Sequence, residues 1–348
     1  MNQKNHYFCT IKYSNMKNEI VLSGIRPTGN LHLGNYFGAV RNFIRMQEEY
    51  NCYFFIADYH SLTTHPKPDD LHGKVRQVLA EYLAAGLDPE KCALYVQSDV
   101  PEVLELYLFL NMNAYLGELE RVTTFKEKVR KQPDNVNAGL LTYPTLMAAD
   151  ILIHKSKYVP VGKDQIPNLE KARDYAARFN NMYQNDYFPI PEGFNFGSDL
   201  VKVPGLDGSG KMGKSEGEGN AIFLIDDEKT IRKKVMRAVT DSGPTEPNSA
   251  KPDAIQNLFT LMSIMSKPET VQFFEEAWNN CSIRYGDMKK QLAEDIVTFV
   301  APLRERIMEY AANDELIKRA ARIGAEKARE SAAKTVREVR EIIGFKHF

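Results

Sequence analysis

Two short segments of this sequence hold residue types that bind and neutralise an anion. In the first, His32-Leu-Gly-Asn35, an imidazole and an amide are spaced so that both can face one spot. In the second, Lys211-Met-Gly-Lys-Ser215, two lysine ammonium groups supply compact point charges in a glycine-rich stretch. A further candidate is Asp150, a lone carboxylate in the mostly apolar stretch 143–154. Taken alone, such an aspartate is more often a hydrogen-bonded structural residue than a ligand-binding group.

A strand that turns into a helix must position the first segment. The apolar residues 20–22 form the strand, which breaks into turn residues before His32. The free N–H groups at the start of the following helix favour an anion such as a phosphate. Gly24, Gly29 and Gly34 would let the backbone approach that ligand closely. From the glycines alone, an ordinary turn between a strand and a helix explains the segment equally well.

The second segment also fits two well-known glycine patterns. Residues 208–215 formally satisfy both the Walker A sequence and the GxGxxG pattern. Both patterns require a helix that opens directly after the glycines. Gly217 and Gly219 stand where that helix should be strongest, which disfavours both interpretations. A P-loop-like NTPase that uses 208–215 stays an alternative function.

Composition predicts a soluble globular protein of one large or two ordinary domains. The chain has 348 residues, 43% of them hydrophobic and 26% charged, with a formal net charge of −1. No apolar run approaches the roughly 20 residues that cross a bilayer, so we expect no membrane segment. The four cysteines lack CxxC spacing, which fits a reducing cytoplasm and suggests no zinc site. Residues 1–15 lack the apolar core of a signal peptide and are expected to be either a disordered extension or a start-site artefact.

The order of apolar runs predicts an α/β protein. Strand-like runs at 52–57, 93–97 and 158–161 alternate with helical stretches, as in a parallel sheet wrapped by helices. In such sheets, ligands bind outside the carboxyl ends of the strands. Residues 126–138 are charged and then rich in Asn and Pro, which predicts a mobile surface connection. A glycine-rich stretch at 194–219 marks a boundary, and beyond it helical patterns dominate.

The first segment resembles the HIGH signature of class I aminoacyl-tRNA synthetases, in the form with Asn in the last place. The second resembles their lysine-bearing signature, with Gly213 where Ser is usual. Further stretches are similar, in the same order, to the bacterial-type tryptophan–tRNA ligase family: Asp58-Tyr-His-Ser-Leu-Thr, Gly117-Glu-Leu-Glu-Arg, Phe125-Lys-Glu-Lys, Gly139-Leu-Leu-Thr-Tyr-Pro-Thr-Leu-Met-Ala-Ala-Asp-Ile-Leu, Val159-Pro-Val-Gly-Lys-Asp-Gln and Tyr285-Gly-Asp-Met-Lys-Lys. The resemblance extends from about residue 20 to near the C-terminus.

The resemblance implies a fold and an activity. The fold would be a Rossmann-type parallel-sheet catalytic domain over 16–217, ending in the lysine loop. A C-terminal all-α anticodon-binding domain would occupy 218–348, and its last helix could pack back on the catalytic domain. The activity would be ATP-dependent formation of tryptophanyl-adenylate from L-tryptophan, followed by transfer to tRNA(Trp). The resemblance also implies a cytoplasmic homodimer, with Mg²⁺ carried by the nucleotide.

Residue by residue, the resemblance implies roles for matching positions. Catalytic roles fall on Lys128, Lys211 and Lys214. ATP binding falls on Arg26, Pro27, Thr28, His32, Gly34, Asn35, Gly162, Lys163, Asp164, Val203, Lys211, Met212, Gly213, Lys214 and Ser215. Tryptophan binding falls on Asp150, Tyr143, Met147, Val159, Val161 and Gln165, with Asp150 accepting the indole N–H. No protein residue is assigned to a metal.

Several positions depart from the family pattern. Leu22 stands where Phe is often found, Thr124 where Gln is often found, and Lys163 where an acidic residue is common. His60 is interpreted as a satisfied polar group beside a strand end. Two further alternatives stay open: a tyrosyl relative, which the stretch 139–152 disfavours, and a non-catalytic homologue, which the intact lysines disfavour.

Overall fold

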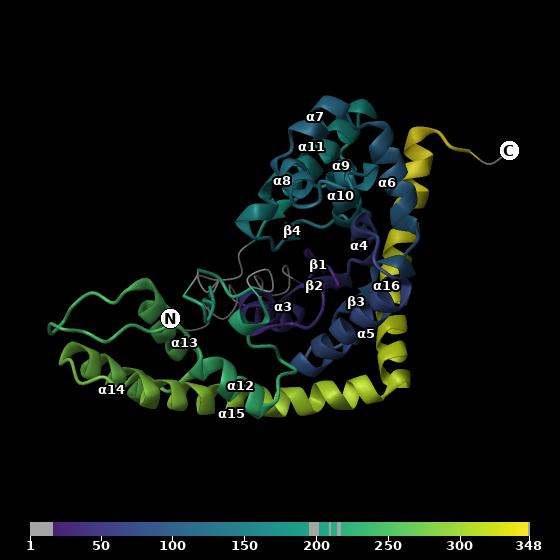
Figure 1. Ribbon diagram of the computed structural model, residues 1–348. Helices are drawn as coiled ribbons and strands as arrows, with labels where there is room; N and C mark the ends of the chain where they lie inside the picture. Colours follow the sequence, from purple (N-terminus) through teal and green to yellow (C-terminus); the bar gives the residue numbers. More distant parts are fainter. Residues whose placement is uncertain (1–16, 195–201, 209, 214–216, 347–348) are drawn as a thin grey trace, which may run out of the picture.

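The computed structural model describes residues 17–194, 202–208, 210–213 and 217–346 (Figure 1). Its sheet has five strands in the order β3-β2-β1-β4-β5, with β1 at Ile20–Ile25, β2 at Asn51–Ile56, β3 at Ala93–Val96, β4 at Tyr158–Val159 and β5 at Glu192–Gly193. Every strand pair is parallel, and Val21 of β1 pairs with Cys52 on one side and Tyr158 on the other. The strand order reverses at β1, which is where an open α/β sheet forms its ligand crevice. The prediction of an α/β protein with a parallel sheet is confirmed.

The strands β1 to β4 divide their side chains between two hydrophobic clusters. Phe54 and Ile56 of β2 belong to one cluster, whereas Tyr53 and Phe55 belong to the other. This alternation follows from the two-residue period of a strand. The first cluster includes residues of α3 (Arg41–Glu49), α5 (Pro68–Ala85), α12 (Glu228–Met236), α13 (Asp253–Met265), α14 (Pro268–Asn279) and α15 (Tyr285–Ala312). The second includes residues of α6 (Glu102–Met112), α10 (Tyr143–Ile153) and α11 (Ile166–Met182).

The last helix, α16 (Asp314–Ile343), crosses the edge of the sheet at β3. Ile317 and Ala320 near its start belong to the first cluster, and Ala328 and Ala332 farther along belong to the second. At Gly324, between them, an added Cβ would collide with the backbone of Leu94 in β3. The helix therefore passes backbone against backbone over the edge strand and joins the two clusters.

Several shorter helices lie between the strands. They are α2 (Leu33–Asn35), α4 (Asp58–Ser61), α7 (Leu116–Arg121), α8 (Thr123–Lys131) and α9 (Ala138–Leu141). The prediction of a loose connection at 126–138 is wrong for its first half, because α8 extends through Lys131. Its one buried residue is Thr124, so α8 lacks the apolar face by which a helix is recognised in sequence. Among the described residues, no helix has both the length and the apolar character needed to cross a bilayer.

Candidate active site

A cavity of about 780 Å³ opens where β1 and β4 end. Its wall continues from Ile25 at the end of β1 and from Val159 at the end of β4. A smaller cavity of about 340 Å³ adjoins it, and the two share Ile25, Arg26 and Asn35. Together they occupy the crevice that the reversal of strand order creates.

The segment 32–35 forms its own cap. His32 Nδ1 accepts the N–H of Asn35 at 3.3 Å, and Asn35 Oδ1 accepts the N–H of His32 at 3.1 Å. The N–H of Leu33 is donated to the carbonyl of Ile222 at 2.9 Å. The prediction that these N–H groups are free to bind an anion is therefore wrong for Leu33 and Asn35. A helix this short can be capped by its own side chains, as in a capping box.

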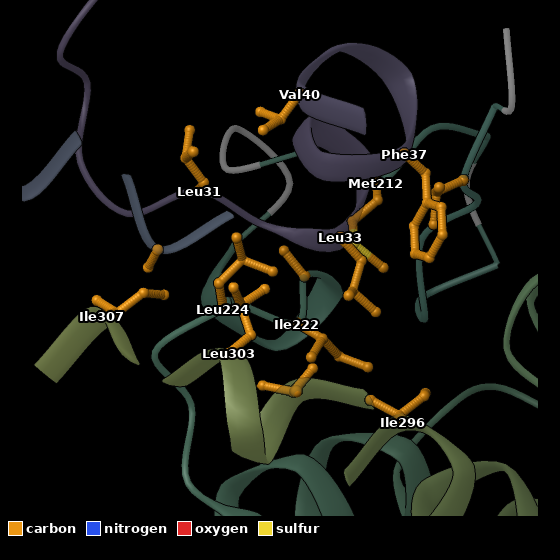
Figure 2. Close-up of a cluster of buried hydrophobic side chains, with 14 of the residues drawn as sticks. Leu31, Leu33, Phe37, Val40, Met212, Ile222, Leu224, Ile296, Leu303 and Ile307 are labelled. Atoms are coloured by element: carbon orange, nitrogen blue, oxygen red, sulfur yellow. The ribbon is translucent and has the colours of Figure 1, made fainter. Parts of the chain in front are cut away.

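The same segment is anchored to distant parts of the chain. Leu31 donates its N–H to the fully buried carboxylate of Glu81 at 2.9 Å and accepts the N–H of Leu224 at 2.9 Å. Figure 2 shows Leu31 and Leu33 in an apolar cluster with Ile222, Leu224 and residues of α15. The lysine loop joins this cluster through Met212, which is buried and donates its N–H to Val203 at 2.9 Å. The segment 32–35 and the lysine loop are therefore anchored in the same hydrophobic cluster.

Four cationic residues of the described chain lie at or beside the cavities: Arg26, Lys128, Lys202 and Lys211. Arg26 lines both cavities, and its buried Nε has no hydrogen-bond partner among the described residues. Lys211 lines the larger cavity. Lys128 places its Nζ 3.5 Å from the centroid of the Tyr143 ring. Burial, with the nearby charge of Arg26, lowers the pKa of Lys128 to about 8. The site is therefore electropositive, as an anion-binding site requires.

Asp150 lies at the apolar end of the larger cavity, where it is 3% exposed. One carboxylate oxygen lies 2.8 Å from His60 Nε2, and the other accepts Gln97 Nε2 at 2.7 Å. Burial raises the pKa of Asp150, and these two hydrogen bonds oppose the rise. His60 Nδ1 and Gln97 Oε1 are buried and have no partner within the described ranges. Asp150 is thus held in one orientation by two fixed neighbours.

His60 and Gln97 were not identified as site residues from the sequence. The interpretation of His60 as a fully satisfied group does not hold for Nδ1, and His60 lines the cavity. His60 lies in the turn of helix after β2, and Gln97 directly follows β3. Their position after the carboxyl ends of parallel strands was the available signal.

The residues after β4 form another wall. Val161, Gly162, Asp164 and Gln165 line the larger cavity. The amide of Gln165 donates to Asp164 Oδ2 at 2.7 Å, and its oxygen accepts Asn168 Nδ2 at 3.0 Å. The side chain of Lys163 lies outside the described residues, as do Lys214 and Ser215.

The structure brings most of the predicted site residues together. Those that line the larger cavity are Arg26, Gly34, Asn35, Tyr143, Met147, Asp150, Val159, Val161, Gly162, Asp164, Gln165, Val203 and Lys211. Thr28 and His32 line the smaller one. Neither cavity is lined by Pro27, Lys128, Met212 or Gly213; Lys128 contacts the Tyr143 ring, and Met212 serves as an anchor.

The structure does not support the P-loop alternative. After the gap at 214–216, the described chain continues as a short 3₁₀ turn at Glu218–Asn220 and then in extended form. Among the described residues that follow, the first α-helix is α12, which begins at Glu228. The phosphate-binding helix that a Walker A sequence requires is therefore missing from this part of the described chain.

A family model, curated relatives and a solved structure all relate this chain to tRNA synthetases. The family model for tRNA synthetases class I (W and Y) matches residues 14–301. A tryptophan–tRNA ligase of Porphyromonas gingivalis is 67% identical over 94% of this chain and 100% of its own length. One of Clostridium perfringens is 40% identical over 94% of this chain and 98% of its own length. A crystal structure of the tryptophanyl-tRNA synthetase of Campylobacter jejuni, complexed with ADP and tryptophan, superposes with a TM-score of 0.85 at 35% identity, covering 94% of this chain and all of that one.

Proposed function

The chain belongs to the class I tRNA synthetases for tryptophan and tyrosine, and we propose how its residues divide the work of the ligase reaction that it catalyses. That reaction activates tryptophan with ATP, releases pyrophosphate and transfers the aminoacyl group to tRNA. One observation carries the proposal: a single crevice holds a fixed buried acceptor at one end and cationic side chains at the other.

We assign tryptophan to the end of the cavity near Asp150. Met147, Val159 and Val161 give this end apolar walls suited to an indole ring. An ionised carboxylate can accept several hydrogen bonds, so Asp150 keeps acceptor capacity after binding His60 and Gln97. The indole N–H is a donor only, which matches this acceptor. His60 and Gln97 would keep the carboxylate aimed while the ligand enters.

We assign ATP to the opposite end, over the segment 32–35 and the smaller cavity. Arg26, Lys128 and Lys211, with Lys214 of the same loop, would neutralise charge that develops on the leaving pyrophosphate. Thr28, Gly34 and Asn35, with Val203 and the residues 162–164, would complete the nucleotide site. Alignment of the tryptophan carboxylate with the α-phosphate would supply much of the rate.

We propose that Mg²⁺ enters with the nucleotide. The described residues contain no group of three or more His, Cys, Asp or Glu side chains able to hold a metal ion. Cationic side chains would instead meet the phosphates that carry it. As the compartment we propose the cytoplasm, which suits the free thiols of Cys52, Cys92 and Cys281.

We propose that the chain forms a homodimer through an apolar patch on α6 and α7. Leu104, Leu108 and Met112 repeat every four residues on the outer face of α6, and Tyr115 and Leu116 extend this patch. The exposed fractions of Met112, Tyr115 and Leu116 are 76%, 62% and 61%. The inner face of α6 is already buried through Val103, Leu106 and Leu110. A helix that is apolar on both faces normally buries both.

Leu108→Glu should therefore convert the protein to monomers in sedimentation velocity. Leu316→Glu is a matched control, since Leu316 is 45% exposed against 47% for Leu108 and lies outside the patch. A dimer that survives Leu108→Glu at micromolar concentration would place the interface elsewhere.

Pyrophosphate exchange into ATP with each amino acid in turn tests the proposed function. Tryptophan should support exchange, and phenylalanine and tyrosine should fail to do so. In Asp150→Ala the ratio of kcat/KM for tryptophan over phenylalanine should fall by 100-fold or more, about 3 kcal/mol, because nothing then reads the indole N–H. An unchanged ratio would give Asp150 a purely structural role, and exchange with tyrosine alone would contradict the function.

A further inference from the structure

We propose that Thr124 and Asn168 are positioning residues, which set the orientation of the Gln165 amide and, through it, of the Asp164 carboxylate. Neither Thr124 nor Asn168 lines a cavity, and neither was assigned a role from the sequence. Both Gln165 and Asp164 line the larger cavity, where the proposed function places Asp164 in the nucleotide site and the family resemblance places Gln165 beside tryptophan. The inference rests on that proposed function and concerns how two side chains of its site are held in one orientation.

The four side chains form one continuous run of hydrogen bonds. Thr124 Oγ1 donates to Asn168 Oδ1 at 2.8 Å, and Asn168 Nδ2 donates to Gln165 Oε1 at 3.0 Å. Gln165 Nε2 then donates to Asp164 Oδ2 at 2.7 Å. Thr124 is 7% exposed and Asn168 is fully buried, so water competes little for the first two bonds. Because buried polar groups need partners, each member constrains the next.

The run has only one chemically consistent direction. An ionised carboxylate accepts hydrogen bonds and donates none, so Gln165 must turn its NH₂ toward Asp164 and its oxygen toward Asn168. Asn168 must then offer its NH₂ to Gln165 and its oxygen to Thr124. A hydroxyl can donate, so Thr124 ends the run without leaving a buried acceptor unpaired. Donor and acceptor of Gln165 are thereby fixed at the cavity wall.

The position of Thr124 links this run to a second part of the site. Thr124 and Lys128 lie four residues apart on α8, which is one turn of helix and therefore one face. The hydrogen bond from Thr124 to α11 thus also holds the helix that carries Lys128. The short hydroxyl of Thr124 does not reach the cavity and acts through Asn168 instead.

Asn168→Asp reverses the run with almost no change in shape. A carboxylate at 168 cannot donate to Gln165 Oε1, so the Gln165 amide must rotate and present its oxygen toward Asp164. We expect KM for tryptophan and KM for ATP each to rise about tenfold or more in pyrophosphate exchange, with a smaller change in kcat. Thr124→Val should raise both KM values in the same sense by a smaller factor, and Thr124→Ser should restore them.

A matched control separates positioning from simple loss of a buried hydroxyl. Thr145 is fully buried on α10, and its hydroxyl pairs with the Tyr175 hydroxyl of α11 at 3.0 Å. Thr145→Val should lower Tm about as much as Thr124→Val but leave both KM values within twofold of wild type. If Asn168→Asp fails to fold, the Thr124→Val and Thr124→Ser pair decides the matter.

The outcomes distinguish the two proposals. If wild-type protein exchanges with tryptophan while Asn168→Asp and Thr124→Val keep wild-type KM values, the positioning proposal is overturned and the proposed function stands. If Thr145→Val raises KM as much as Thr124→Val, the effect is general loosening and the positioning proposal is also overturned. If wild-type protein shows no exchange with tryptophan, the proposed function is contradicted. The positioning proposal, which rests on it, is then contradicted as well.

Discussion

Lys128 carries a positive charge that the free protein stabilises poorly and that the phosphates of the proposed nucleotide would stabilise better. Its ammonium group rests 3.5 Å from the centre of the Tyr143 ring, partly buried and near the positive Arg26. Such contacts with an aromatic face partly replace the water that burial removes. The arrangement leaves the positive charge destabilised, so that phosphate groups would be a better partner than the ring.

The lowered pKa predicts a pH profile. In the free protein the pKa of Lys128 is about 8, so the ammonium group loses its proton as pH rises through that value. The kcat/KM for ATP, which reports groups of the free enzyme, should therefore fall on the alkaline side of about pH 8. Lys128→Arg keeps its charge throughout and should shift this fall to higher pH. A fall that persists unchanged in Lys128→Arg would belong to another group.

Many individual residues of the candidate site were predictable from the sequence. Asp150, Tyr143 and Gln165 were identified because they fall within motifs that resemble a known family, and they do converge on one cavity. Glu81, His60 and Gln97 were missed for a physical reason. Their importance comes from the partners they meet across the fold, Leu31 for Glu81 and Asp150 for the other two. A single sequence does not display such pairings.

Among the elements, α16 shows how a helix can be fitted to a sheet edge. It passes β3 at Gly324, and small residues such as Ala325 and Ala328 continue the contact. The sequence indicated a long charged helix that could pack back on the catalytic domain, but it did not indicate the strand against which it lies. The separation of the chain into units at 16–217 and 218–348 stays a prediction, and the first hydrophobic cluster includes residues from both ranges.

Gly324→Ala should be strongly destabilising for one added methyl group. The new Cβ would collide with the Leu94 backbone, which cannot yield as a flexible side chain could. We expect the free energy of unfolding to fall by about 3 kcal/mol, measured by urea denaturation. Gly286→Ala in α15 is the control, since its Cβ meets open space and should be neutral or stabilising by up to about 1 kcal/mol. Equal effects at the two sites would contradict the close packing.

At the scale of the whole molecule, His154 ties three elements together. Its ring stacks on Tyr53 of β2, with 4.2 Å between centroids. Nε2 lies 3.0 Å from the Tyr95 hydroxyl of β3, and Nδ1 lies 3.1 Å from the Ser331 hydroxyl of α16. Burial lowers the pKa of His154 to about 3, so the ring is neutral in the folded protein.

This neutral histidine predicts acid sensitivity of the fold. Between pH 6.5 and about 3 the unfolded chain binds a proton at His154 that the folded protein does not bind. Stability from this group is therefore complete above pH 6.5 and falls by about 1.4 kcal/mol per pH unit as pH drops toward 3. His154→Gln cannot titrate there and keeps polar atoms near Tyr95 and Ser331. Urea unfolding at several pH values should show a shallower slope for the variant, whereas parallel curves would assign the acid sensitivity to other groups.

Two backbone hydrogen bonds join residues 31–33 to residues 222–224. They limit where the chain can be cut without loss of structure. A fragment that ended at residue 217 would lose the carbonyl of Ile222 and the N–H of Leu224 that hold the segment 31–33. Leu31 and Leu33, buried in the intact chain beside α15, would then face water (Figure 2). For protein engineers, the cut after residue 217 that the sequence suggests is therefore a poor site for a split reporter or for grafting a foreign C-terminal segment. A graft that keeps residues 218–227 joined to the part of the chain before them would retain both hydrogen bonds.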